Sequence, residues 1–298
     1  MGYLFLALAL LCGSTKGYCG KKTSGAVSEY RDAMLVNALR MVLCIVFGFA
    51  LLAVQGDVAL LKVDLPTLAI TALSGVTTSV FVVSWLLSVR KGAYMMVDVF
   101  LMLGVLVAVV LSAVCFGEEV TVKQMIGLAL LILAVCIMCS YSSGLKEKIT
   151  PAAILLLVAC GVSNGLTDFS QKLFVKYAQS STVAVFNFYT YVFSAITLAV
   201  LYGFSGKKQK GSAANALRTV KSIAGYVLVM ALCLYLNSFF KTQAASLLPA
   251  AQLYPLNQGC GLMLSSLMAA VFFREKITVK AITGLCIAFV ALLLINVL

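Results

Sequence analysis

Charged residues are rare in this chain, and five of them fall inside long apolar stretches. An ionised side chain within a lipid bilayer is costly unless it is paired or reaches water, so each one is a candidate functional residue. Their mixed signs suit ion pairs or the binding of a charged group. The five residues are Lys16, Arg40, Asp98, Asp168 and Lys241.

We interpret these residues first as two ionic latches on either side of a central site. Helical rise along the predicted spans puts Lys16, Arg40 and Asp98 toward one membrane face, and Asp168 and Lys241 toward the other. The inner latch would join Asp98 to Arg40 or Lys16, and the outer latch would join Asp168 to Lys241. Breaking a buried pair by removing one partner costs about 3–5 kcal/mol, which would strongly bias a two-state carrier.

Other roles stay open for the same residues. Lys16 and Lys241 could extend their ammonium groups to the membrane interface, and the two aspartates could cap helix ends. The cations could instead bind a charged substrate directly. Asp98 could also load and release a coupling proton, because carboxylates inside membranes form proton relays in pumps and transporters.

Neutral polar side chains make a second candidate site, for the substrate itself. Pro255 interrupts the hydrogen bonds of its span, and such broken backbone is tolerated where it lines a cavity. Nearby amide and hydroxyl groups offer donors and acceptors without charge, which suits amino acids, sugars or nucleosides. The alternative is hydrogen bonding between helices, worth about 0.6 kcal/mol each. The candidate substrate-binding residues are Asn37, Asn164, Asn187, Gln252, Tyr254, Asn257 and Gln258.

Ten apolar stretches must position these residues. The chain has 298 residues, of which 62% are hydrophobic and 11% charged, unlike a soluble domain. A bilayer core of about 30 Å needs about 20 helical residues. We predict an all-α polytopic membrane protein with ten transmembrane helices, over residues 3–19, 33–54, 66–89, 93–116, 123–141, 151–173, 183–204, 222–245, 249–273 and 279–298.

The net charge and the cysteine content limit which partners, metals and cofactors we expect. A net charge of +12 on a soluble protein would suggest nucleic acid, but here most Lys and Arg lie in the loops that follow odd-numbered spans. Because positive residues stay in the cytoplasm, we expect both termini to face outward from a bacterial-type plasma membrane. The chain has no histidine, and most of its ten cysteines lie singly in apolar runs. We therefore predict no metal, no cofactor and no nucleic-acid partner.

The two halves of the chain share a motif. Residues 118–123 (EEVTVK) precede the last span of the first half, and residues 275–280 (EKITVK) precede the last span of the second half. Asn37 and Asn187 also correspond. We predict two five-helix repeats, residues 1–145 and 146–298. Because each contains an odd number of spans, the repeats would be inverted relative to each other, as in many secondary transporters.

The second half resembles the EamA-type drug/metabolite transporter superfamily. The marks are Pro249 before a span, Pro255 within it, the residues 272–275 (FFRE) at its end, and Thr278 and Gly284 in the final helix. The first half repeats this pattern more weakly. The resemblance implies a small-molecule carrier with a cavity lined mainly by the first, third and fourth helices of each half. Bacterial relatives are usually drawn with both termini in the cytoplasm, opposite to the orientation that the charges predict.

These observations predict a secondary transporter that moves a small polar metabolite by alternating access. It would be coupled to a proton or to exchange, and would act as a monomer or homodimer. The alternative is an exchanger of anions, such as organophosphates or nucleotide sugars, that uses cavity Lys and Arg. A non-transporting scaffold or an intramembrane enzyme is disfavoured, because the chain lacks a Ser-His, Cys-His or metal set, and no catalytic residue is predicted.

Overall fold

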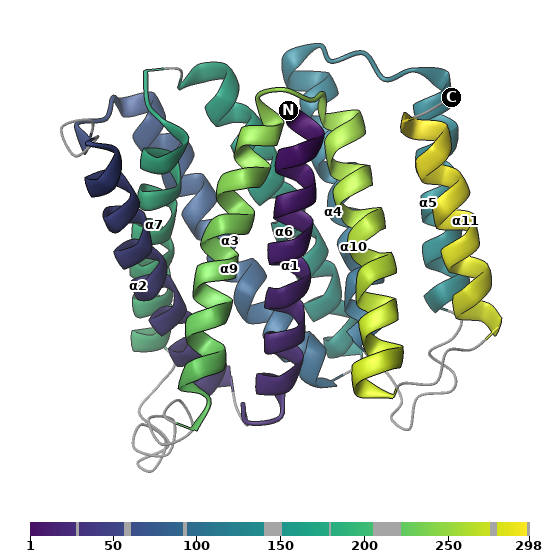
Figure 1. The fold of residues 1–298 in the computed structure, drawn as a ribbon, viewed down its shortest axis with the longest axis horizontal. Coiled ribbons are helices and arrows are strands. Elements are labelled where there is room, and N and C mark those ends of the chain that lie inside the picture. Colours follow the sequence, from purple (N-terminus) through teal and green to yellow (C-terminus); the bar gives the residue numbers. More distant parts are fainter. Residues whose placement is uncertain are drawn as a thin grey trace.

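Ten α-helices stand side by side in the described part of the chain (Figure 1). The computed structural model describes residues 1–27, 30–56, 61–91, 94–139, 151–178, 180–204, 222–274 and 279–296. The helices are α1 (Gly2–Ser24), α2 (Tyr30–Gln55), α3 (Leu65–Lys91), α4 (Tyr94–Phe116), α5 (Val122–Cys139), α6 (Pro151–Tyr177), α7 (Val183–Phe204), α9 (Ala224–Ala245), α10 (Ala250–Phe273) and α11 (Val279–Asn296).

Helix length and composition confirm the prediction of an all-helical polytopic membrane protein. Six helices are long and apolar enough to span a bilayer, and three shorter helices among the described residues are apolar as well. The predicted windows match the helices closely. Helix α1 runs past its window to Ser24, since a helix can continue beyond the apolar residues that face lipid. The six helices long and apolar enough to span a bilayer cover Tyr30–Gln55, Leu65–Arg90, Pro151–Tyr177, Val183–Phe204, Ala224–Ala245 and Ala250–Phe273.

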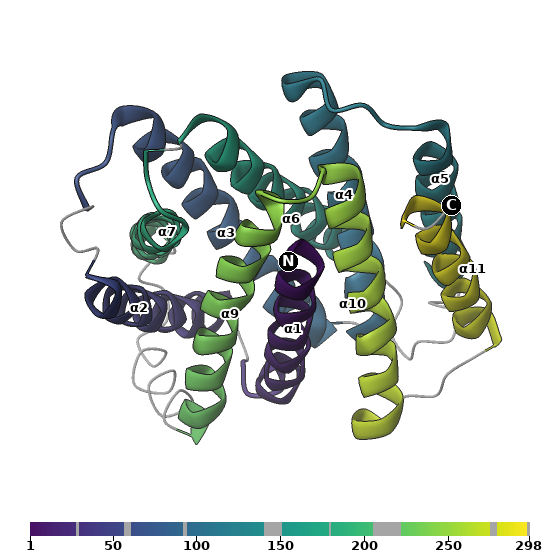
Figure 2. The ribbon, with the colours of Figure 1, turned by 45° about the horizontal axis from the view of Figure 1, so that its top comes forward.

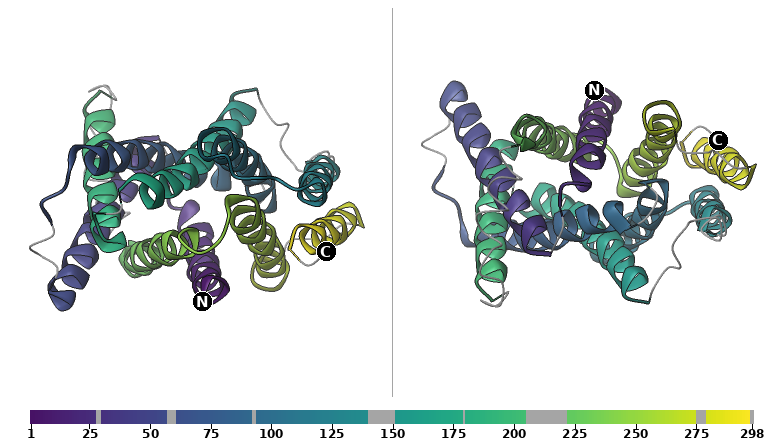
Figure 3. Two further views of the ribbon diagram at one scale, coloured as in Figure 1. Left: turned by 90° about the horizontal axis from the view of Figure 1, so that it is seen from above. Right: turned by 90° about the horizontal axis from the view of Figure 1, so that it is seen from below.

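The helices of the two halves pair in a regular way. Helix α1 packs on α9 and α3 packs on α6, while α2 packs on α7, α4 on α10 and α5 on α11. The first to fifth helices of one half correspond in order to those of the other half. If each helix is replaced by its counterpart, the α1–α9 pair becomes the α6–α3 pair, and each of the other three pairs stays the same. Helices α2 and α7 lie at one edge of the bundle, and α5 and α11 lie at the opposite edge (Figure 3). Helix α1 begins at the end of the bundle where α6 finishes (Figure 1).

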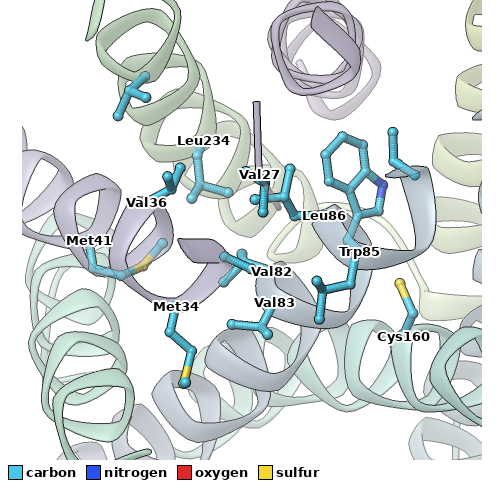
Figure 4. Packing of buried hydrophobic residues seen from close by; sticks show 14 of the residues in the cluster. Val27, Met34, Val36, Met41, Val82, Val83, Trp85, Leu86, Cys160 and Leu234 are labelled. Atoms are coloured by element: carbon cyan, nitrogen blue, oxygen red, sulfur yellow. The ribbon is translucent and has the colours of Figure 1, made fainter. Parts of the chain in front are cut away.

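Two apolar clusters hold the bundle together. The first joins α2, α3 and α9, where Met34 and Met41 pack near Val82, Leu86 and Leu234 (Figure 4). The second joins α4, α5, α10 and α11, the helices on the right of Figure 2. Burying an aliphatic side chain of this size contributes about 1.5–3 kcal/mol in water. Inside a membrane the same residues stabilise the bundle through close packing instead.

Glycines bring α4 against α6. A Cβ at Gly104 would lie 2.4 Å from the carbonyl oxygen of Gly161, and a Cβ at Gly165 would lie 2.3 Å from the carbonyl oxygen of Gly104. Real Cβ atoms do not approach so closely, so the two backbones touch only because these residues lack side chains. Small residues allow such contacts between membrane helices. This contact fixes α6, which supplies several residues of the site, against α4.

The repeated motif has a structural role in its first copy. Thr121 caps α5, because the Gln124 backbone N–H donates to the Thr121 hydroxyl at 3.3 Å. The Gln124 side chain in turn accepts the Thr121 backbone N–H at 3.0 Å, which completes a capping box. Gly127 then lets α5 approach Ile295 and Ala291 of α11. The first residues of the second copy, 275–278, lie outside the described residues.

Candidate functional site

A polar cavity of about 110 Å³ lies between α1, α3, α4, α6, α7, α9 and α10. A cavity of roughly 10–15 Å³ by this measure holds one water, so there is room for several waters or a small ligand. Five residues predicted from the sequence line it, namely Lys16, Asn164, Lys241, Asn257 and Gln258.

Seven further polar residues line the cavity, and sequence reasoning did not select them as site residues. Most are small hydroxyl residues, which occur at many helix contacts and therefore give little signal in a sequence. Asn237 of α9 is one of them, and it also contacts a neighbouring helix. Its amide donates to the Ala9 carbonyl of α1 at 2.6 Å. The seven are Ser14, Thr78, Thr167, Gln171, Asn237, Ser238 and Ser265.

An ion pair includes one of the lysines that line the cavity. The Lys241 ammonium of α9 donates to the Asp168 carboxylate of α6, and both side chains are buried. The Tyr254 hydroxyl of α10 donates to the backbone carbonyl of Asp168 at 2.5 Å. Three helices are therefore tied together at one residue. The structure brings together the two residues proposed as the outer latch, and it puts Tyr254 behind them rather than in the cavity wall.

A second polar layer lies beyond this pair. Lys172 follows Asp168 by one helical turn, about 6 Å along α6. Its ammonium lies 3.2 Å from the Glu118 carboxylate and donates to the Leu248 carbonyl at 2.6 Å. Glu118 also accepts the backbone N–H of Ala250 at 2.7 Å. Two layers of hydrogen-bonded charge therefore lie on successive turns of α6 toward this end of the bundle.

Four buried polar atoms around the cavity have no hydrogen-bond partner among the described residues. They are the side-chain nitrogen of Asn164 and one side-chain oxygen each of Asp168, Gln171 and Asn257. Buried polar groups are nearly always satisfied by protein or water. Because Asn164, Gln171 and Asn257 line the cavity, a polar ligand or water inside it can satisfy them.

Three other predicted substrate residues do not line the cavity. Asn37 donates to the Ala33 and Val82 carbonyls at 2.8 and 3.2 Å. Asn187 accepts the Ser238 hydroxyl at 2.5 Å, so it supports a lining residue from behind. Gln252 lies on the first turn of α10 and is only partly buried. No residue of α2 is in the described cavity wall, and α7 reaches it through Tyr191, one turn after Asn187.

The residues proposed for an inner latch are only partly described. Arg40 is buried on α2 and donates to Asn37 at 2.6 Å. Its Nε has no hydrogen-bond partner within the described ranges, and Arg40 does not line the cavity. Lys16 lines the cavity and lies 5.7 Å from the centre of the Phe81 ring. The side chain of Asp98 lies outside the described residues.

Aromatic side chains join α1 and α10 at the opposite end from the ion pair. The Tyr18 ring lies 5.4 Å from that of Phe272 and 5.5 Å from that of Phe273. Lys21 and Lys22 lie over the Phe273 ring at 6.0 and 5.6 Å, within the range of cation–π attraction. Sequence reasoning missed this contact because Tyr18 and Phe273 are 255 positions apart.

A metal centre has no support in the described residues. They contain no group of three His, Cys, Asp or Glu side chains that could hold a metal ion. The cavity chemistry is instead that of amides, hydroxyls, the Lys16 ammonium and the Asp168–Lys241 ion pair. Such groups bind and orient a polar molecule by hydrogen bonds.

Comparison with known proteins finds a family match and a similar solved fold. Residues 1–140 match the EamA-like transporter family. Nearly the whole chain also follows the fold of a solved protein, titled only "Crystal structure of protein", with a TM-score of 0.67 and 16% identity over 99% of this chain and 96% of that one. No curated protein matches the sequence. Over residues 1–140 this match confirms the resemblance to EamA-type drug/metabolite transporters that the sequence predicted.

Proposed function

We propose that the protein is a secondary transporter that moves a small polar metabolite across the plasma membrane by alternating access. The observation that carries this proposal is the polar cavity whose Asn164, Gln171 and Asn257 side chains hold unsatisfied hydrogen-bonding atoms. A scaffold would have no need of such a cavity. Lipid surrounds the bundle, the substrate occupies its centre, and no cofactor takes part.

The charges of the cavity favour a neutral or zwitterionic substrate. Of the two lysines in the described wall, Lys16 and Lys241, the second is neutralised by Asp168, and Arg40 does not line the cavity. An exchanger of organophosphates or nucleotide sugars would need several uncompensated cations in the wall. Amide donors and acceptors beside a separable ion pair instead suit an amino acid, and the amides alone suit a sugar or nucleoside.

The pairing of helices supports an inverted repeat. In this proposal residues 1–145 and 146–298 are two five-helix units related by a half-turn about an axis in the membrane plane. Such a pair of units can rock about a central site. The Asp168–Lys241 pair would be the outer gate, and Asp98 with Arg40 or Lys16 would be the inner gate. From the positive charge of the loops we expect both termini to lie outside the membrane. We also expect coupling to a proton or to exchange, and a monomeric or homodimeric assembly.

Ligand-induced stabilisation of the purified protein tests the proposal. A ligand present at 100 times its Kd stabilises a protein by about 2.7 kcal/mol, so pools of amino acids, sugars and nucleosides should contain compounds that raise the melting temperature in detergent. Asn257→Leu should abolish the stabilisation, because Asn257 lines the cavity. Gln252→Leu on the same helix is the matched control, because Gln252 does not line it.

Transport itself should follow the same pattern. A compound that stabilises the protein should enter or leave proteoliposomes that contain it, and Asn257→Leu should reduce that flux while Gln252→Leu does not. Stabilisation that survives Asn257→Leu, or flux that does not depend on the protein, would contradict the proposal.

A further inference from the structure

Glu118 opens the motif that occurs in both halves of the chain, but the cavity does not use it. The residue follows α4 and its side chain is 24% exposed. One carboxylate oxygen lies 3.2 Å from the Lys172 ammonium of α6. The other accepts the Ala250 N–H at the first turn of α10 at 2.7 Å. A single side chain of the first half therefore binds two helices of the second half.

The turn between α9 and α10 is pinned by these contacts. Lys172 donates to the Leu248 carbonyl in this turn at 2.6 Å, while Glu118 binds the N–H of Ala250 just after it. The first N–H groups of a helix have no partner within the helix, and the positive end of the helix dipole favours an anion there. The carboxylate of Glu118 thus suits this position both as an acceptor and as a charge.

These contacts lie between the cavity and an open space at the same end of the bundle. That space has a volume of about 330 Å³ and includes Glu118, Lys172, Lys176 and Ser246 in its wall. On the other side of Lys172, one helical turn away, is the Asp168–Lys241 pair, whose lysine lines the cavity. A molecule that moved along α6 between the cavity and this outer space would pass both layers.

We propose that Glu118 is a positioning residue of the outer gate, which holds the α9–α10 turn closed through Lys172 and Ala250. This inference rests on the proposed alternating access. Asp168 and Lys241 both belong to the second half, whereas Glu118 links the two halves, so rocking of one half against the other must break its contacts. Water reaches this side chain, and water-accessible ion pairs are weak, so the contact can open and close during a transport cycle.

The accessibility of a cavity cysteine measures this gate without any substrate. Thr167 lines the cavity, and Thr167→Cys would react with a membrane-impermeant maleimide in sealed vesicles when the outer gate opens. Ser246→Cys, in the wall of the outer space, identifies vesicles in which that side faces the reagent. The ten native cysteines also react. Their labelling is measured in each variant without Thr167→Cys and is subtracted.

Glu118→Gln should raise the labelling rate of Thr167→Cys by about fivefold or more, the range of typical coupling between states. Glu119→Gln is the matched control, since Glu119 is the exposed neighbour, and it should label at the parent rate. Lys172→Gln should also raise the labelling rate. The double variant should label no faster than either single variant, because both changes break the same contact.

Equal labelling of the Glu118→Gln and Glu119→Gln variants would overturn the inference. If Glu118→Gln does not fold, the Lys172→Gln variant alone tests the inference. Labelling of Lys172→Gln at the parent rate would then overturn the inference. Failure of the proposed function is separable, because it would appear as missing ligand stabilisation and flux while the labelling still responds to Glu118.

Discussion

Asp168 of α6 and Lys241 of α9 form an ion pair in which the carboxylate side chain is 0% and the lysine side chain 9% exposed. The pair leaves one carboxylate oxygen of Asp168 without a partner. It therefore neutralises the charge at the end of the cavity while keeping an acceptor available. Replacing either residue alone leaves the other charge buried.

The Asp168–Lys241 pair should show strong coupling in stability. Asp168→Asn or Lys241→Met should each lower the free energy of unfolding by about 3–5 kcal/mol, because an uncompensated buried charge remains. The double variant should recover part of the loss, because no charge is then buried. Thermal unfolding of the parent, both single variants and the double variant in detergent measures the coupling. If the stability loss of the double variant equals the sum of the two single losses, the two residues do not depend on each other.

Helix packing at Gly104 should tolerate no side chain. Gly104→Ala should destabilise the protein by about 1–3 kcal/mol, the usual cost of overpacking, because the new Cβ would lie 2.4 Å from the Gly161 carbonyl oxygen. Gly261 is the corresponding residue of the second half, and a Cβ there has only the Gln258 amide oxygen at 4.0 Å. Gly261→Ala is the control and should keep the parent melting temperature or raise it.

The inner latch stays a prediction that transport assays can test. Asp98→Asn and Arg40→Gln should each abolish transport while the protein is still expressed and folded, if these residues close the cytoplasmic end. Arg40 already donates to Asn37, so an Asn37→Ala variant shows how much of any effect comes from that contact. Normal flux in both the Asp98→Asn and Arg40→Gln variants would rule out the latch.

Asp64 should make stability depend on pH near the start of α3. Hydrogen bonding from Thr67 holds the pKa of Asp64 below its ordinary value, and the carboxylate accepts the Thr67 backbone N–H at 3.3 Å. A lowered pKa in the folded state adds stability above the unfolded pKa, and this contribution is lost as the pH falls through the folded pKa.

Asp64→Ala should therefore lower the melting temperature at neutral pH, and its difference from the parent should shrink below about pH 4, the usual pKa of aspartate. Asp64→Asn keeps an acceptor at the helix start without a titrating group, so its difference from Asp64→Ala should stay constant with pH. Melting curves in detergent between pH 3 and pH 7 measure both differences. A constant gap between the parent and Asp64→Ala would contradict the prediction.

The site illustrates what could be predicted from single residues. Lys16, Asn164, Lys241, Asn257 and Gln258 could be chosen from the sequence, because a polar group in an apolar span has few places to go other than a cavity or a partner. Asn37 and Asn187 carry the same signal, yet their helices lie at the edge of the bundle. The sequence does not say which face of a span meets the centre, so these amides could not be told from cavity residues.

Sequence alone determined that the protein is a bundle of membrane helices, which stretch of the chain forms each helix, and which family it resembles. These properties depend on local composition and on short motifs, since a span must match the thickness of the bilayer wherever its helix lies. The tertiary structure decided which charges meet. Asp168 and Lys241 are separated by 73 positions, and Glu118 and Ala250 by 132. Contacts at such separations depend on how helices pair across the bundle, and that pairing follows from packing such as the glycine contact between α4 and α6.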